Sequence, residues 1–325
     1  MPVQKATGLI GVAKQAAKGT LVANPTFAHG VSSGTLVKVE PSEAVLAVTA
    51  GKRTAYNVVR DAVANGSDFT SPAYLKTLGL WLLGALGSDV VTGAGPYLHT
   101  YATGDLPYLS LYAKGLDTTY EAIRDIKVDQ LSLAWDGSQP VVLGITGIGT
   151  VFSYPATFTP TTDETGSESF LVPVGGTFQY DLDGATLATA RVVKGELTVS
   201  NSCALVDLSA AIEADDIYEG EQVHGVKLTI IPDSLVDFRT VVTGSPTGTA
   251  AAAIPTTGSF SLVFKENNGT GTLTVTAAKC AFLCAFPDAD PKGGPVEVEL
   301  VGLPVMPAGG TAPVVYALSN AQASY

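Results

Sequence analysis

The chain has 325 residues, of which 46% are hydrophobic and only 15% are charged, and its formal net charge is −12. Nucleic-acid binders hold phosphates on a basic face, so the acidic balance excludes that class, although it fits a channel wall that repels nucleic acid. Abundant Thr, Val, Ala and Gly indicate a β-rich protein, long enough for one large core or two ordinary ones.

Targeting signals and cysteines indicate the expected compartment. Residues 1–20 lack the continuous apolar segment of a secretory signal, and the most apolar segment, Leu75–Leu86, is too short to span a bilayer. Cys203, Cys280 and Cys284 are an odd number in a long chain, so they form no disulfide framework. We expect a soluble protein without membrane contact that folds in a reducing cytoplasm.

The first 70 residues are predicted to be mostly extended. Residues 1–30 form an expected N-terminal arm with one short strand at Gly8–Lys14. Two strands follow on either side of a turn at Pro41–Ser42, and Tyr56–Ala64 fits either a strand or a short amphipathic helix. Asn65–Ser67 carries a turn signal.

The strongest helix signal follows Ser71. Ser71 is expected to accept a hydrogen bond as the N-cap residue, Pro72 is tolerated at the first helical position, and Gly87 is the expected C-terminal cap. The apolar face comprises Leu75, Leu78, Leu82 and Leu86, widened by Trp81 and Leu83. A face this wide must pack against a sheet, so we expect the helix to cover a β layer.

Strands dominate the prediction after this helix. They are expected at Tyr97–Thr103, Leu109–Lys114, Lys127–Trp135 and Val141–Ile148, with a tight turn at Asp136–Gly137. The Thr-, Ser- and Pro-rich segment from Thr150 to Asp183 is interpreted as linker-like. Further strands are expected at Thr177–Asp181, Leu187–Val193, Glu196–Ser202 and Val223–Pro232, with turns at Asp183–Gly184 and Lys194–Gly195 and a weaker helix at Ser234–Val242.

The order of these elements occurs twice. Between Tyr74 and Gly149 an apolar helix precedes four strand candidates, and a fainter copy of this order follows Ile230. We therefore predict an N-terminal arm (1–30), a first domain (31–155), a related second domain (156–303) and an extended, uncharged C-terminal arm (304–325). A chain that carries one unit twice is typical of a component of an assembly.

No catalytic centre emerges from the residue types that would form one, so catalytic, cofactor-binding and metal-binding residues are predicted to be none. Gly30–Gly34 matches the G-x-S-x-G nucleophile elbow, but a strand rather than a helix is predicted after it. His29, His99 and His224 are far apart in the sequence, and we interpret them as strand-surface residues.

The remaining motifs have structural interpretations. Cys280 and Cys284 share one face of a strand as small buried residues. The sequons at Asn65 and Asn268 are interpreted as tight turns, and the glycines of Gly144–Gly149 lie within a strand rather than in a phosphate-binding loop. Turns explain the acidic clusters better than Ca²⁺ sites, and the acids also fit a negative channel; the clusters are Asp181/Asp183, Glu213/Asp215/Asp216 and Asp288/Asp290.

Four segments, taken in order, resemble one protein family. They are Gly11–Thr20 (GVAKQAAKGT), Leu82–Gly87 (LLGALG), Tyr97–Pro107 (YLHTYATGDLP) and Lys127–Leu133 (KVDQLSL). In this order they resemble the tail tube, or major tail, proteins of long-tailed, siphovirus-like bacteriophages. The resemblance is clearest over residues 8–149 and weaker after Thr177.

The resemblance implies a β-sandwich or half-barrel with a flanking α-helix. Together with the repeated order of elements it predicts a mainly β fold with two related domains of this kind. Subunits of this family form rings whose inner sheets join into a continuous β-barrel, and the rings stack into a tube that conducts DNA into the host cell. The implied protein is structural rather than enzymatic, needs no cofactor, and belongs to the virion tail after assembly in the host cytoplasm. Its implied partners are further copies of itself, the tape measure protein and DNA in the lumen, and the tail terminator and distal tail proteins at the tube ends.

The doubled unit predicts how many chains form a ring. Most rings of this family contain six equivalent domains, so three chains with two domains each would complete a ring with pseudo-sixfold symmetry. We therefore favour a trimer over a hexamer. The alternative function is a capsid or tail-surface decoration protein with immunoglobulin-like domains, which would share the β composition without needing to polymerise.

Overall fold

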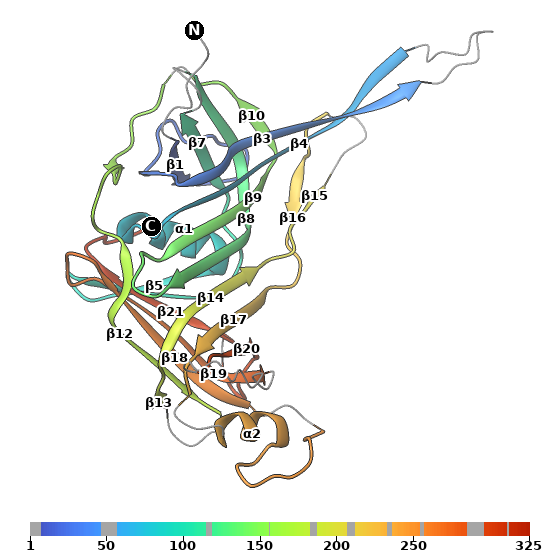
Figure 1. Cartoon of the computed structure of the whole chain (residues 1–325). Helices are drawn as coiled ribbons and strands as arrows, with labels where there is room; N and C mark the ends of the chain where they lie inside the picture. Colours follow the sequence, from blue (N-terminus) through green and yellow to red (C-terminus); the bar gives the residue numbers. More distant parts are fainter. Residues whose placement is uncertain are drawn as a thin grey trace.

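Alternating apolar and polar residues fold into strands that dominate the structure, so the protein is mainly β (Figure 1). The computed structural model describes residues 8–46, 57–114, 119–155, 157–182, 187–206, 212–232, 236–253, 257–284, 296–310 and 312–325. Among these residues, every strand except the short β15–β16 pair belongs to one hydrogen-bonded network.

The elements follow one another in two stretches of the chain. The first stretch contains β1 (Leu9–Lys14), β2 (Phe27–Gly30), β3 (Ser33–Leu46), β4 (Asn57–Pro72), α1 (Leu75–Leu86), β5 (Gly87–Thr92), β6 (Tyr97–Thr103), β7 (Leu109–Lys114), β8 (Tyr120–Asp136), β9 (Val142–Gly149) and β10 (Val151–Ser153). The second contains β11 (Thr162–Asp163), β12 (Leu171–Asp181), β13 (Ala188–Thr189), β14 (Val192–Ser200), β15 (Ala204–Val206), β16 (Asp216–Tyr218), β17 (Val223–Ile230), α2 (Val236–Thr243), β18 (Thr257–Glu266), β19 (Thr272–Cys284), β20 (Val298–Pro304) and β21 (Val315–Asn320).

Two sets of six strands pair in the same order. The first strand set has the order β1–β7–β8–β9–β4–β3, with antiparallel neighbours throughout. The second strand set has the order β12–β18–β19–β20–β17–β14, also antiparallel throughout. In each set a helix follows the fifth of these strands, α1 after β4 and α2 after β17. The helix-then-strand order that the sequence repeats therefore corresponds to a repeated strand topology.

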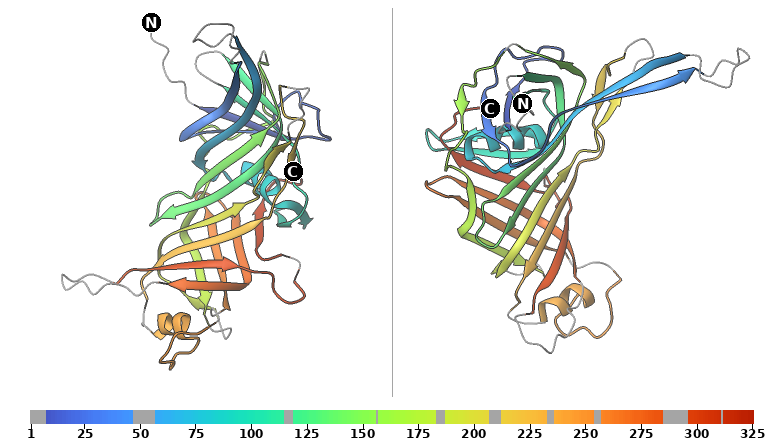
Figure 2. Two further views of the ribbon diagram at one scale, coloured as in Figure 1. Left: turned by 90° about the vertical axis from the view of Figure 1, so that its right-hand side faces the viewer. Right: turned by 45° about the horizontal axis from the view of Figure 1, so that its top comes forward.

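The two strand sets meet where the end of β8 extends beyond β7 and pairs with β14, the outer strand of the second set. β8 pairs with β14, so the strands β3, β4, β9 and β8 continue directly into β14, β17 and β20 (Figure 2). A second connection runs through β21, which pairs with β19 on one side and with β6 on the other. One sheet therefore extends through both halves of the chain.

α1 is buried beneath this sheet. It contacts β8 and β14 as well as β1, β2, β5, β6 and β21, and every residue from Thr77 to Leu86 is buried. The predicted apolar face of the helix is confirmed. Gly87 adopts a φ of 90°, and its N–H bonds to the carbonyl of Leu83, so the predicted C-terminal cap is confirmed as well.

The predicted start of the helix is wrong. Ser71 and Pro72 end β4, where they lie opposite Leu143 and Val142 of β9, and the helix begins at Leu75. Ladder hydrogen bonds to β9 outweigh the local capping signal of the Ser-Pro pair.

A distant carboxylate takes the place of the predicted cap. Glu164, from the segment between β11 and β12, is buried and accepts hydrogen bonds from the backbone N–H groups of Lys76 (3.3 Å) and Thr77 (2.7 Å). It also accepts a bond from the Thr77 hydroxyl at 2.5 Å. A negative charge at a helix N-terminus satisfies free N–H groups and complements the helix dipole.

β3 and β4 form a long hairpin that projects from the rest of the molecule (Figure 1). β3 runs through Pro41–Ser42 with only a register shift after Ser42, so the predicted turn there is wrong. Asn65–Ser67 lies inside β4 opposite Gly149–Gly147, so this turn is wrong too. The segment from Asn57, for which both strand and helix fit the sequence, is strand. In each case a partner strand overrides a local turn signal.

Other predicted breaks are also bridged by strand pairing. The predicted turn at Lys194–Gly195 is wrong, because β14 passes through it opposite both β8 and β17. The linker-like segment from Thr150 to Asp183 contains β10, β11 and β12. Asp183–Gly184 lies outside the described residues.

Both segments expected to be extended arms contribute strands to the sheet. β1 lies between β2 and β7, and β21 lies between β19 and β6. The chain end folds back as well, because the ring of Tyr325 lies 5.5 Å from that of Phe27 and 4.8 Å from that of His99. These segments therefore differ from free arms and close the layer that covers α1.

The carboxylate cap predicts a stability change. Glu164→Ala leaves the N–H groups of Lys76 and Thr77 without a partner in a buried position, and we expect a loss of about 1–2 kcal/mol in the free energy of unfolding. Glu164→Gln keeps an acceptor oxygen and should lose less. Glu168→Ala removes an exposed carboxylate from the same segment and should change stability by less than about 0.5 kcal/mol. Urea denaturation measures all three, and equal losses for Glu164→Ala and Glu168→Ala would contradict the capping role.

Candidate functional site

The candidate site is the face and the edge of the sheet where the two strand sets join. The joint runs from Gln130 opposite Ser200 to Asp136 opposite Lys194, seven consecutive pairs without a register shift. Residues directly opposite each other in an antiparallel pair point to the same face of a sheet. Side chains from both sets therefore form common rows across it.

Two such rows define what we term the polar face. The first crosses β3, β4, β9, β8, β14 and β17 as Ser33, Thr70, Gly144, Ser132, Thr198 and Gly225. The second crosses the same strands as Thr35, Asp68, Thr146, Gln130, Ser200 and Val223. Apart from Asp68 and Val223, both rows consist of hydroxyl, amide and glycine positions, so they lack the large side chains that would build a core or a ligand pocket.

The polar face is a shallow, weakly acidic surface. Its central part is a depression of about 410 Å³ whose lining includes Asp68 and Glu196. Its lysines lie beside acids: Lys227 pairs with Glu299 at 2.8 Å, and Lys38 pairs with Glu40 at the same distance. The described part of this face therefore offers no cluster of unpaired cations to a phosphate chain.

The opposite face of the same strands is apolar and buried. At most 2% of each of the following side chains is exposed: Phe69, Leu131, Leu133, Leu143, Ile145, Leu197, Val199, Val226 and Leu228. Together with α1 they belong to one continuous core that spans both strand sets. The sheet is therefore one-sided, and its polar face is its solvent face.

Two amides tie the end of α1 to the second half of the chain. Asn201 donates to the carbonyls of Ala85 (3.0 Å) and Val128 (2.8 Å). Gln222 donates to the same Ala85 carbonyl (3.0 Å) and to the side-chain oxygen of Asn201 (2.8 Å). Carbonyls at a helix C-terminus lack partners within the helix, so these bonds hold the two strand sets together below the joint.

Charged contacts fasten the β15–β16 hairpin to the first strand set. Lys127 forms an ion pair with Glu219 and lies 4.4 Å from the centre of the Tyr108 ring. Tyr108 donates to Asp216 at 2.6 Å, and Lys18 reaches the same carboxylate at 2.9 Å. Burial opposes the charge of Asp216, but the bonds from Tyr108 and Lys18 hold its pKa down at about 2. Asp215 and Asp216, from the acidic cluster that also contains Glu213, thus belong to an ion-pair network with Lys18.

The three histidines lie in strands but not on their surfaces, so that prediction is wrong. His29, His99 and His224 are at most 3% exposed. The ring of His29 accepts a bond from the indole N–H of Trp81 at 3.2 Å, and His99 lies 3.0 Å from Asp89 and 2.8 Å from the carbonyl of Gln322. Each histidine comes from a different strand, and the structure does not bring them together.

The nucleophile-elbow motif has no catalytic surroundings. Ser32 is exposed between β2 and β3, and its N–H bonds to the carbonyl of Thr70. A strand rather than a helix follows, as predicted. The glycines of Gly144–Gly149 lie within β9, which confirms that they form no phosphate-binding loop.

Cysteines and acids show no metal-binding arrangement. All three cysteines are free; Cys280 is buried and Cys284 half-buried on the same face of β19. Within the described ranges, no three His, Cys, Asp or Glu side chains gather as metal ligands. Asp183, Asp288 and Asp290 lie outside the described residues.

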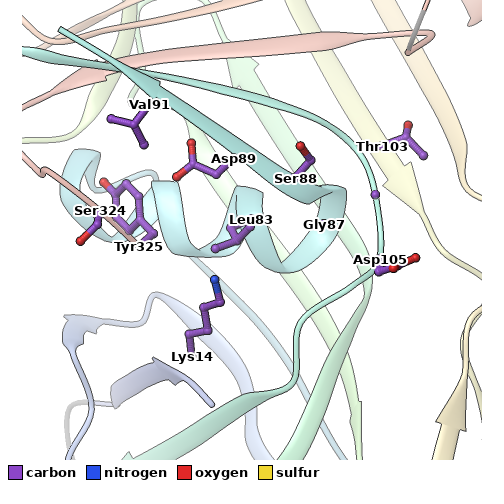
Figure 3. Close-up of a pocket in the computed structure, with 11 residues that line it drawn as sticks. Lys14, Leu83, Gly87, Ser88, Asp89, Val91, Thr103, Asp105, Ser324 and Tyr325 are labelled. Carbon is purple, nitrogen blue, oxygen red and sulfur yellow. The ribbon is translucent and has the colours of Figure 1, made fainter. Parts of the chain in front are cut away.

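A further depression lies beside the chain end. It measures about 620 Å³, and Lys14, Ser88, Asp89, Asp105 and Tyr325 line it (Figure 3). The Tyr325 hydroxyl accepts a bond from Asn320 at 2.5 Å. Its lining has no histidine or cysteine to pair with Ser88, so it shows no nucleophilic constellation.

Comparisons with known proteins add no assignment. Neither a scan against protein-family models nor a search of curated proteins returns a match. In the part of the chain that the structure describes, no helix has the length and apolar character to cross a membrane.

The buried histidine predicts a pH dependence of stability. Burial lowers the pKa of His29 to about 4, against a weaker opposing effect of its bond to the Gly30 carbonyl. The unfolded chain binds this proton below about pH 6.5 and the folded chain does not, so folding stability falls as the pH drops from about 6.5 to 4. The shift corresponds to at most about 3 kcal/mol.

Urea denaturation of wild type and His29→Gln at pH 7 and pH 4.5 tests this dependence. Glutamine supplies an acceptor for Trp81 but does not titrate, so the variant should lose less stability between the two pH values. The same loss in both proteins would contradict the assignment of His29 as a buried neutral histidine.

Proposed function

We propose that this protein is the repeating subunit of a bacteriophage tail tube, of the long-tailed, siphovirus-like kind. The observation that carries the proposal is the repeated strand order together with the joint at β8 and β14. The pairing of two sheets within one chain supports the proposal, because the same kind of pairing between chains would close a ring. The resemblance of the segments between residues 8 and 149 to tail tube proteins agrees with this assignment.

Three chains would complete one ring. Each chain supplies two related half-barrel domains, so three copies give six sheet units around the axis and a continuous inner β-barrel. Closure also pairs the sheet edges that a single chain leaves open, and open edges are sites of uncontrolled association. We therefore propose a trimeric ring with pseudo-sixfold symmetry, and stacked rings as the tube.

The polar face is proposed to line the lumen. Hydroxyl, amide and glycine positions with a slight excess of acid repel DNA phosphates and offer no cation cluster that would hold them during transit. Lumen contacts with DNA and the tape measure protein would then be brief. The tail terminator and distal tail proteins are the proposed partners at the tube ends, and no catalytic step or cofactor is involved.

Electron microscopy of the purified protein tests the proposal. We expect rings or tubes with a central hole, and class averages with threefold symmetry and six similar units. Native mass spectrometry of single rings should give the mass of three chains. Dispersed monomers at high concentration would favour the alternative decoration protein with immunoglobulin-like domains, and a ring of six whole chains would contradict the trimer.

A further inference from the structure

The two strand sets correspond position by position, apart from one extra residue in β3 between Thr35 and Lys38 and one in β8 between Val128 and Gln130. Gly147 of β9 lies opposite Ser67 of β4, and Gly302 of β20 lies opposite Val226 of β17. Gly147 therefore corresponds to Gly302, and the residues that precede Ser67 and Val226, Gly66 and Gly225, correspond to each other. Gly34 of β3 likewise takes the position of Gly195 in β14, since they lie opposite Phe69 and Leu228. Glycines therefore coincide on three strands, which fixes β3 as the equivalent of β14 and β8 as the equivalent of β19.

This correspondence identifies the residues that match the internal joint. In the joint, Leu131 of β8 lies opposite Val199 of β14. The equivalent of Leu131 is Cys284, which lies opposite Leu300 as Leu131 lies opposite Ile145. The equivalent of Val199 is Val39, as their β-hairpin partners show: Val39 lies opposite Asn65, and Val199 lies opposite His224.

Both of these positions lie on edges without a partner in the described chain. β3 pairs only with β4, and Leu283 and Cys284 of β19 pair only with β20. Val39 is 39% exposed, whereas Val199 at the equivalent position is 1% exposed. An apolar side chain therefore stands uncovered where the internal joint would cover it.

We infer that the β3 edge of one copy pairs with the β19 edge of a second copy in the register of the β8–β14 joint, which sets Val39 beside Cys284. This inference rests on the proposed ring and adds which edges meet and in which register. The partner is a second copy because the chain itself contains the complementary edge and already forms one such pairing, between β8 and β14. The charge along β3 is also near neutral, since Lys38 is paired with Glu40, so it does not oppose the approach of a second copy.

The β15–β16 hairpin supports the same arrangement. It continues the β14–β17 hairpin and lies against the first strand set through Lys18, Tyr108 and Lys127. By the same correspondence, the projecting β3–β4 hairpin is the one that reaches across the second strand set of the next copy. In the single chain this hairpin projects away from the rest of the molecule, so it is free to contact a neighbouring copy (Figure 1).

Cysteine cross-linking of assembled protein tests the register. Residues directly opposite in an antiparallel pair have Cβ atoms about 4.5–5.5 Å apart, close enough for a disulfide after small adjustments. With copper–phenanthroline, Val39→Cys should join the native Cys284 of the next copy, so most of the chain should move to bands of two and three chains on a non-reducing gel. Glu40→Cys, one residue further along the same edge, points to the opposite face and should remain a single chain, as should Val39→Cys combined with Cys284→Ala.

The outcomes separate this inference from the proposed function. Rings without Val39→Cys cross-links, or equal cross-linking of Glu40→Cys, would overturn the edge pairing and leave the tube function standing. Absence of rings from wild-type protein would overturn the proposed function itself. If Val39→Cys does not assemble, hydrogen exchange of the wild type decides: amides of Ser33–Glu40 should exchange at least about tenfold more slowly in rings than in dissociated chains, and unchanged exchange would overturn the pairing.

Discussion

The antiparallel pairing of β8 with β14 is the interaction on which the rest of the structure depends. It joins the end of β8 in the first strand set to β14 in the second, so the two sheets form one sheet with a polar side and an apolar side. The apolar side then extends over both sets, so α1 is enclosed by segments from distant parts of the chain. Residues from distant segments therefore bond to both ends of the helix. Glu164 accepts hydrogen bonds from N–H groups of the first turn, and Asn201 and Gln222 donate to a carbonyl of the last turn.

Among the described residues, β3 has a partner on one side only, and so does the end of β19 at Leu283–Cys284. An edge strand with exposed apolar side chains is a liability for a monomer, and natural monomers protect such edges with charges, bulges or covering segments. Here Val39 stays exposed at a position that the internal joint would cover. The proposed ring explains this exposure and the polar face by one arrangement, because closing the edges also encloses the face with the fewest large side chains.

Much of the local structure could be predicted from the sequence, and its failures share one physical cause. Periodicity predicted α1, β6 and β7 correctly, and Gly87 marked the helix end, because these signals are local. Ser71 and Asn65 carry a local capping or turn signal, yet both lie in β4 opposite β9, which is far away in sequence. Pro41 also carries a turn signal, but it lies inside β3 opposite Val63 of the next strand. The cap by Glu164 and the burial of the histidines likewise depend on long-range packing, which no local pattern encodes. The polar face escaped prediction because its rows exist only once the register across six strands is known.

If the polar face of the joined sheet lines a closed channel, a reconstruction of the assembled tube at a resolution that separates strands will show it. We expect a closed barrel in which β14 of each chain follows β8 of the same chain and the side chains of Ser132, Thr198 and Ser200 point toward the axis. A tube in which this row points outward, or in which the β8–β14 pairing is broken, would contradict it.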